Sequence, residues 1–158
     1  MKIIRSSEYR RMPWKNGGGE TVEVAVSPEG ASLDAFDWRV SMAHVASSGP
    51  FSRFPGIDRT LAVLAGSGIR LGVAGRCTVV LDRDTPAFTF PGGDFTTAEL
   101  IAGPIDDLNV MTRRVSHRHR LLRIPAETPV PLRREGNLLL VMVPEAAATL
   151  RIATNEHA

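Results

Sequence analysis

The sequence has very little cysteine and no hydrophobic run long enough to cross a membrane. Cys77 is the single cysteine in 158 residues, so an internal disulfide cannot form. It stands in the apolar run 77–81, where we expect a buried thiol. Residues 1–6 contain no apolar core of signal-peptide length. These absences predict a soluble protein in a reducing, cytoplasmic compartment, without a membrane partner.

A strong charge of either sign is also lacking. Nineteen lysines and arginines face 17 acidic residues, which gives a net charge of +2. This balance falls short of the basic density of a dedicated nucleic-acid binder. The most basic segment, residues 113–123, has no interleaved aromatic side chain on which a base could stack. The sequence therefore argues against nucleic acid as a partner.

Apolar side chains recur with a spacing of two, which predicts strands, and a convincing long helix is missing. In 21–26, three valines alternate with Thr21, Glu23 and Ala25. Further strands are expected at 38–42, 60–64, 69–73, 77–81, 87–90, 138–143 and 150–153. Short strands separated by glycine turns at intervals of about 8–12 residues are typical of an all-β sandwich or barrel. The chain, 43% hydrophobic, is long enough for one compact core.

One turn, residues 13–21, combines glycines with polar side chains. Three consecutive glycines allow another group to approach the backbone closely. A flat apolar face, a cation, an amide, a hydroxyl and a carboxylate surround them, on Trp14, Lys15, Asn16, Thr21 and Glu23. This set suits a small polar ligand, and the alternative is a solvent-facing turn that only needs conformational freedom. In the strand 38–42, Arg39 and Ser41 share one face, which could point to solvent or into a ligand cavity.

Four separated blocks of the sequence carry a family resemblance. They are 14–19 with Thr21 and Glu23, 38–41, 49–56 through Arg59, and 107–111. In this order, over residues 3 to 143, they resemble the HutD/Ves family. The resemblance implies a cupin-like double-stranded β-helix, a compact bicupin of two small β-barrels forming one unit, 1–158. The first half would be approximately 1–104 and the second 105–158, with N-terminal strands that the two can share.

The resemblance also implies a function. HutD is encoded with the histidine-utilisation enzymes and is thought to tune that pathway by binding a small acidic intermediate, such as formylglutamate, formiminoglutamate or urocanate. Ves members are linked to cold stress, so the family alone does not fix the role. Cupins often dimerise, and a homodimer is expected on this resemblance only. The alternatives are a hydrolase or isomerase of a small acid, with Glu23 as its base, and a scaffold that binds a partner through 113–123.

A metal and other cofactors are not expected. Aligned on its glycines, the first cupin motif places two histidines and a glutamate at positions occupied here by Pro55, Ile57 and Leu61, which have no lone pairs to give. His117 and His119 would share one face of a strand and could hold a metal. Neighbouring arginines would repel a cation, so a solvated basic strand or a contact with an anion is the favoured interpretation.

Arg59 is the principal candidate for ligand binding, because a rigid guanidinium can form two simultaneous hydrogen bonds with a carboxylate. Its alternative role is a structural ion pair, for example with Asp58. The predicted ligand-binding residues are Arg59, Lys15, Asn16, Gly17, Gly18, Trp14, Thr21, Glu23, Trp38, Arg39, Ser41, Phe51, Phe54, Asn109 and Met111. A catalytic residue is not assigned unless the protein is an enzyme, in which case it is Glu23.

Overall fold

The computed structural model of the chain describes residues 2–14, 17–124 and 129–143. By its contacts the chain divides into two compact units, 1–123 and 124–158. The strands lie in the first unit, which also holds a single 3-10 turn, η1 (Ser6–Glu8). They are β1 (Arg10–Pro13), β2 (Gly19–Ser27), β3 (Trp38–Val45), β4 (Gly49–Pro50), β5 (Ile57–Ala65), β6 (Ile69–Val73), β7 (Cys77–Leu81), β8 (Phe88–Pro91), β9 (Thr96–Leu100) and β10 (Ile105–Arg113).

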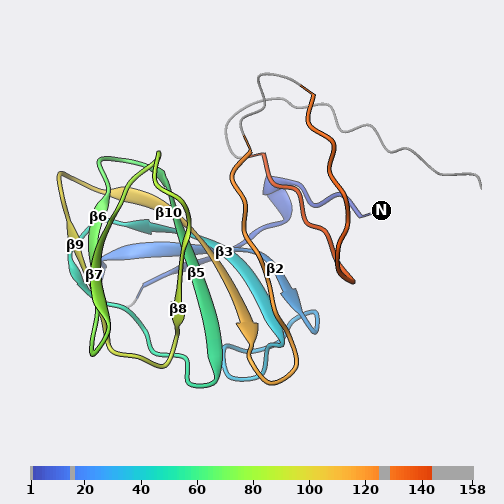
Figure 1. Cartoon of the computed structure of the whole chain (residues 1–158), viewed down its shortest axis with the longest axis horizontal. Helices are drawn as coiled ribbons and strands as arrows, with labels where there is room; N and C mark the ends of the chain where they lie inside the picture. Colours follow the sequence, from blue (N-terminus) through green and yellow to red (C-terminus); the bar gives the residue numbers. More distant parts are fainter. Residues whose placement is uncertain (1, 15–16, 125–128, 144–158) are drawn as a thin grey trace, which may run out of the picture. The chain divides into compact units, whose positions relative to one another are not determined.

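Two antiparallel sheets form the first unit. One has six strands in the order β1-β2-β3-β10-β5-β8, and the other has four in the order β4-β9-β6-β7. Figure 1 shows β6, β7 and β9 gathered on one side of the unit and β2 and β3 on the other. The apolar core joins the two sheets, because Leu61 and Val63 of β5 cluster with Ile69 and Leu71 of β6. The predicted all-β fold is confirmed.

Most of the predicted strands form, and β2, β3 and β5 are longer than predicted. The strands expected at 69–73 and 77–81 match β6 and β7. Four strands were not predicted, namely β1, β4, β9 and β10. The strand expected at 138–143 does not form in the described part of the chain, and 150–153 lies outside it. An apolar run forms a strand only where a neighbouring strand can pair with its backbone, and the sequence pattern does not show whether such a neighbour is present.

The prediction of a buried Cys77 is wrong, because the Cys77 side chain is exposed. It begins β7, which lies at the edge of the four-stranded sheet and pairs with β6. Only Leu81, at the far end of this strand, is fully buried. An edge strand at the rim of a sheet leaves an apolar run partly in contact with solvent, which the sequence pattern does not reveal.

The glycine turn is explained by the protein's own packing. Gly17 has a φ of 68°, a conformation that other residues rarely adopt. A Cβ atom at Gly19 would lie 2.1 Å from the carbonyl oxygen of His44 and 3.1 Å from the Trp14 ring. The close approach that the glycines predicted is therefore made by β3 and by Trp14. Lys15 and Asn16, expected to bind ligand in this turn, lie outside the described residues.

Strand β10 occupies the centre of the six-stranded sheet, between β3 and β5. It starts at Ile105, where the sequence predicted the second half of a bicupin to begin. This strand therefore completes the same sheet as the N-terminal strands. A second barrel built from the remaining residues stays a prediction. The described residues contain no helix that is long and apolar enough to span a membrane.

Candidate ligand site in the barrel interior

A layer of polar side chains crosses the inner face of the six-stranded sheet. Its members are all at most 8% exposed, and we refer to them as the polar layer: Glu23, Arg39, Ser41, Arg59, Asp107 and Asn109. The strand register brings them together, because Ser41 lies between Glu23 and Asn109, and Met111 lies between Arg39 and Arg59. Directly opposed residues of an antiparallel pair share a face, so these side chains project into the barrel.

Arg39 has a complete set of partners. Its Nε donates to the Glu23 carboxylate at 2.7 Å, and its Nη1 donates to the Ser41 hydroxyl at 3.2 Å. The other carboxylate oxygen of Glu23 lies 3.9 Å from Arg10. Buried charges are tolerated when they are paired and hydrogen-bonded, and this pair meets both conditions. The question whether Arg39 faces solvent or the interior is thus answered: it faces the interior.

Arg59 is buried to a similar degree but has different partners. Its Nε and Nη2 both donate to the side-chain oxygen of Asn109, at 2.8 and 2.5 Å. The guanidinium carbon lies 4.5 Å from the ring centre of Phe51 and 5.6 Å from that of Phe90. The described residues place no carboxylate oxygen within 4.0 Å of its nitrogens. Asp58, the proposed ion-pair partner, instead accepts from Arg114 at 2.8 Å.

The charge of Arg59 is therefore buried without a direct counter-ion among these residues. Burial lowers the pKa of Arg59 to about 10, the nearby Asp107 opposes this decrease, and Arg39 adds to it. With a pKa of about 10, the guanidinium remains a cation at neutral pH. The two aromatic rings stabilise this cation through their faces. An anion placed beside it would supply the missing charge.

Asp107 is a buried carboxyl group that the sequence analysis did not select. Its Oδ1 accepts from the Asn109 amide at 2.5 Å, and its Oδ2 has no partner among the described residues. Burial raises the pKa of Asp107 to about 7, against the opposing effects of Arg59 and Asn109. The side chain is 1% exposed, and its register neighbours are Ala43 and Val63. The spacing of two between Asp107 and Asn109 on a strand was the signal that could have found it.

The other predicted site residues are distributed over two faces. Phe51 lies on Arg59, and Phe54 packs near Met111 and edge-on to Phe36, with ring centres 6.2 Å apart. Trp38 lies on the opposite face of β3 from Arg39, away from the polar layer. Its prediction as a wall of the site rested on the family block, which does not reveal the direction of a side chain.

The glycine turn contributes a wall near the same interior. The Trp14 indole N–H donates to the Thr21 hydroxyl at 2.8 Å, and the ring packs against the core that contains Ala43 and Val63. Gly18 is buried, and its carbonyl accepts the backbone N–H of Ala46. Thr21 is the register neighbour of Ala43, which is in turn paired with Asp107. Trp14 of this turn thus packs on the same core cluster that contains the register neighbours of Asp107.

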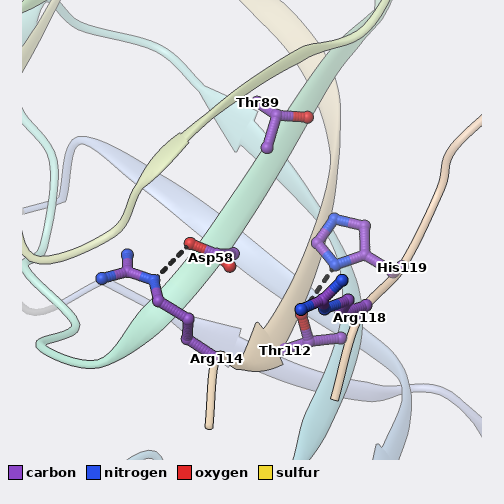
Figure 2. Close-up of a pocket in the computed structure, with 6 residues that line it drawn as sticks. All are labelled: Asp58, Thr89, Thr112, Arg114, Arg118 and His119. Atoms are coloured by element: carbon purple, nitrogen blue, oxygen red, sulfur yellow. Dashed lines mark hydrogen bonds and ion pairs between the residues drawn. The ribbon is translucent and has the colours of Figure 1, made fainter.

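A surface cavity of about 360 Å³ lies on the other face of the six-stranded sheet. Figure 2 shows its lining residues, Asp58, Thr89, Thr112, Arg114, Arg118 and His119. The His119 ring is held by two hydroxyls, with Nε2 2.7 Å from Thr60 and Nδ1 2.8 Å from Thr112. A second cavity, of about 340 Å³, is lined by residues of the 52–57 loop and its neighbours. The polar layer lines neither of these two cavities.

The solvated basic strand expected around His117 and His119 does not form. Strand β10 ends at Arg113, and a turn follows it. Ser116 contacts the His117 ring at 2.9 Å, whereas His119 is held on the sheet, so the two imidazoles have separate partners. In the part of the chain that the structure describes, no three metal-binding side chains converge. Ile57 and Leu61, which occupy metal-ligand positions of the cupin motif, belong to the buried core.

Two facing antiparallel sheets around a packed interior, with buried arginines inside, define a cupin-like barrel with a cationic interior. KdgF from Halomonas sp. shares this fold, with a TM-score of 0.53 at 16% identity, over 72% of this chain and 95% of that one. The family profile of HutD matches residues 6–158. The chain belongs to the HutD family.

Named relatives support this assignment. A 21.2 kDa protein from the hutC 3' region of Pseudomonas putida is 40% identical over 121 residues, and protein Ves of Citrobacter koseri is 42% identical over 111 residues. These matches cover 77% and 68% of this chain but 63% and 56% of the relatives. The structure of HutD from Pseudomonas fluorescens SBW25, in a formate condition, superposes with a TM-score of 0.62 at 40% identity, over 69% of this chain and 58% of that one.

Proposed function

We propose that the barrel binds a small carboxylate metabolite of histidine breakdown and that this binding tunes histidine utilisation. The candidate ligands are formylglutamate, formiminoglutamate and urocanate, and Arg59 would hold the carboxylate. The observation that carries the proposal is a buried guanidinium which hydrogen-bonds an amide oxygen, with no carboxylate within ion-pair distance among the described residues. A ligand carboxylate provides the charge that this cation lacks.

The surroundings of Arg59 favour recognition of a small planar acid. Phe51 and Phe90 fix the plane of the guanidinium, and Asn109 holds two of its donors. A guanidinium held in one plane loses little conformational entropy when it binds a carboxylate. Phe51 lies in the irregular segment 51–56 and covers the guanidinium, so ligand entry requires this segment to move. Loops on a rigid scaffold commonly have this role.

The enzymatic alternative, with Glu23 as a base, has less support. The Glu23 carboxylate is the ion-pair partner of Arg39, at 2.7 Å, and a second arginine lies 3.9 Å away. A general base has to lie within hydrogen-bond reach of the substrate, and both oxygens of Glu23 face arginines of the protein itself. Binding without turnover is therefore the function that the arrangement supports better.

Isothermal titration tests the proposal. We expect saturable binding of formylglutamate, formiminoglutamate or urocanate to the full chain. Arg59→Lys should weaken binding at least about tenfold, because an ammonium cannot reproduce the paired hydrogen bonds, while the melting temperature stays nearly unchanged. Arg70→Lys is the matched control, because Arg70 is exposed and paired with Glu99. The absence of binding by all these acids, or full binding by Arg59→Lys, would contradict the proposal.

A further inference from the structure

The free oxygen of Asp107 is the feature of the polar layer that carboxylate binding alone leaves unexplained. A buried acceptor that has no donor is unfavourable, and native proteins rarely retain one without a role. Asp107 is 1% exposed, and its Oδ2 lacks a partner among the described residues. Its Oδ1, in contrast, is engaged by Asn109 at 2.5 Å. Asn109 and the backbone N–H of Ala43 thus act on the carboxyl group, and Oδ2 has no hydrogen-bond partner among the described residues.

Asn109 joins this free acceptor to the cation that binds the acid. Its side-chain oxygen accepts from Arg59, and its amide nitrogen donates to Asp107. The amide is used on both sides, so it fixes the Arg59 guanidinium and the Asp107 carboxyl group relative to one another. The three side chains lie on one face of the sheet, on β5 and β10. A donor-rich group and a free acceptor therefore lie on the same wall of the barrel.

We propose that Asp107 selects, among small acids, those that also carry an N–H donor, through a hydrogen bond from that donor to Oδ2. This inference rests on the proposed function and names the class of ligand: a carboxylate for Arg59 combined with an imidazole, imino or amide N–H for Asp107. The anionic end of the ligand would thus meet the cation Arg59, and its N–H donor would meet the acceptor Asp107. Simple carboxylates would satisfy Arg59 and leave Asp107 without a partner.

A matched pair of ligands tests the selection in the full chain. Urocanate and 3-(2-furyl)acrylate share the acrylate carboxylate and a five-membered ring, but only urocanate has a ring N–H. At pH 8, where Asp107 is mostly ionised, hydrogen bonds to charged groups are worth enough to predict about tenfold to hundredfold tighter binding of urocanate by the wild-type protein. Asp107→Asn keeps the size of the side chain and can place an amide donor where the acceptor was. We expect this variant to lose the preference and to retain binding of furylacrylate.

The controls separate this inference from the function on which it rests. Asp106→Asn changes the neighbouring carboxylate, which is half-exposed and hydrogen-bonded to His44 at 2.8 Å, and should keep the preference for urocanate. If the wild-type protein bound both acids with equal affinity and Arg59→Lys bound neither, selection by Asp107 would be wrong. Carboxylate binding by Arg59 would still be supported. A preference that survives in Asp107→Asn would also overturn it. Failure of both acids to bind would contradict the two proposals together.

Discussion

The two buried arginines of the barrel interior differ in how their charge is balanced. Arg39 and Arg59 lie on either side of Met111 in the sheet register and are 4% and 7% exposed. Arg39 contacts a carboxylate at 2.7 Å, whereas Arg59 contacts an amide oxygen and two aromatic rings. The nearest acidic influence on Arg59 comes from Asp107, which Asn109 separates from it.

This difference indicates that Arg39 stabilises the fold, whereas Arg59 is available to bind a ligand. Arg39 and Glu23 form a buried ion pair in which each side chain neutralises the charge of the other. Arg59 retains its charge beside a carboxyl group whose pKa is raised to about 7, so Asp107 does not provide a full counter-charge at neutral pH. Buried arginines are therefore informative about function only when their partners are known. The variants below test this distinction, beginning with the largest expected effect.

Arg39→Met should cause the largest loss of stability. It removes the direct partner of a buried pair and leaves the Glu23 carboxylate with only the exposed Arg10, 3.9 Å away. Breaking such a pair costs about 3–5 kcal/mol of unfolding free energy. Urea unfolding followed by circular dichroism measures the change. The double variant Arg39→Met with Glu23→Leu should recover much of the lost stability. If Arg39→Met alone were as stable as the wild-type protein, the buried Arg39–Glu23 pair would not be needed for stability.

The second effect is a pH dependence that belongs to Asp107. Its pKa rises from 3.8 to about 7, so the folded protein binds a proton that the unfolded chain has released between these values. The contribution of Asp107 is therefore present at low pH and is lost as the pH rises toward 7. The expected slope is about 1.4 kcal/mol per pH unit well below pH 7 and flattens near the pKa, which gives about 2 kcal/mol between pH 5 and 7.

Asp107→Asn provides the reference for this measurement, because it cannot titrate. The groups that act on Asp107 are Arg59, Asn109, the backbone N–H of Ala43 and Asp106. The difference in unfolding free energy between the wild-type protein and Asp107→Asn, measured by urea at pH 5, 6 and 7, isolates the carboxyl group from other titrations. A difference that does not change with pH would mean that Asp107 has an ordinary pKa in the folded protein.

The sequence predicted the fold better where strands have one polar and one apolar face. The alternation at Thr21–Val26 and Trp38–Met42 predicted these strands correctly, although consecutive residues on both faces of each strand are buried. The short strands β1, β4 and β9 lack such a pattern, with few apolar residues in four, two and five positions. The position of β10 in the centre of the sheet depends on pairing between distant segments, which a local pattern cannot contain.

For the candidate site, the sequence could identify Arg59 but not its surroundings. The alternation of Arg39 and Ser41 showed that they share a face, and the register settled that this face is the interior. That Asp107 is buried with a free oxygen follows only from its neighbours Ala43 and Val63, on two other strands. Trp38 lies on the other face of β3 from Arg39, and the sequence alone could not say which of these two faces is the interior.

Arg59→Met should change stability much less than Arg39→Met. It removes a buried charge together with its desolvation cost, and the thioether can pack against Phe51 and Phe90. The main loss is the hydrogen bonding to Asn109, so we expect a net change of about 1 kcal/mol or less in either direction. Urea unfolding at pH 7 gives the value. A loss as large as that of Arg39→Met would assign Arg59 a structural role.

Arg70→Gln should have the smallest effect and gives the scale for the others. Arg70 on β6 pairs with Glu99 on β9 at 2.8 Å, and both side chains are more than half exposed, at 52% and 65%. Water screens such a pair and its side chains lose entropy on pairing, so the expected change in unfolding free energy is about 0.5 kcal/mol. The same measurement in 1 M salt should reduce this value further, because the charges are in contact with solvent. If instead Arg70→Gln matched Arg39→Met, the loss would reflect removal of any arginine from a strand, and burial of the Arg39–Glu23 pair would not be its cause.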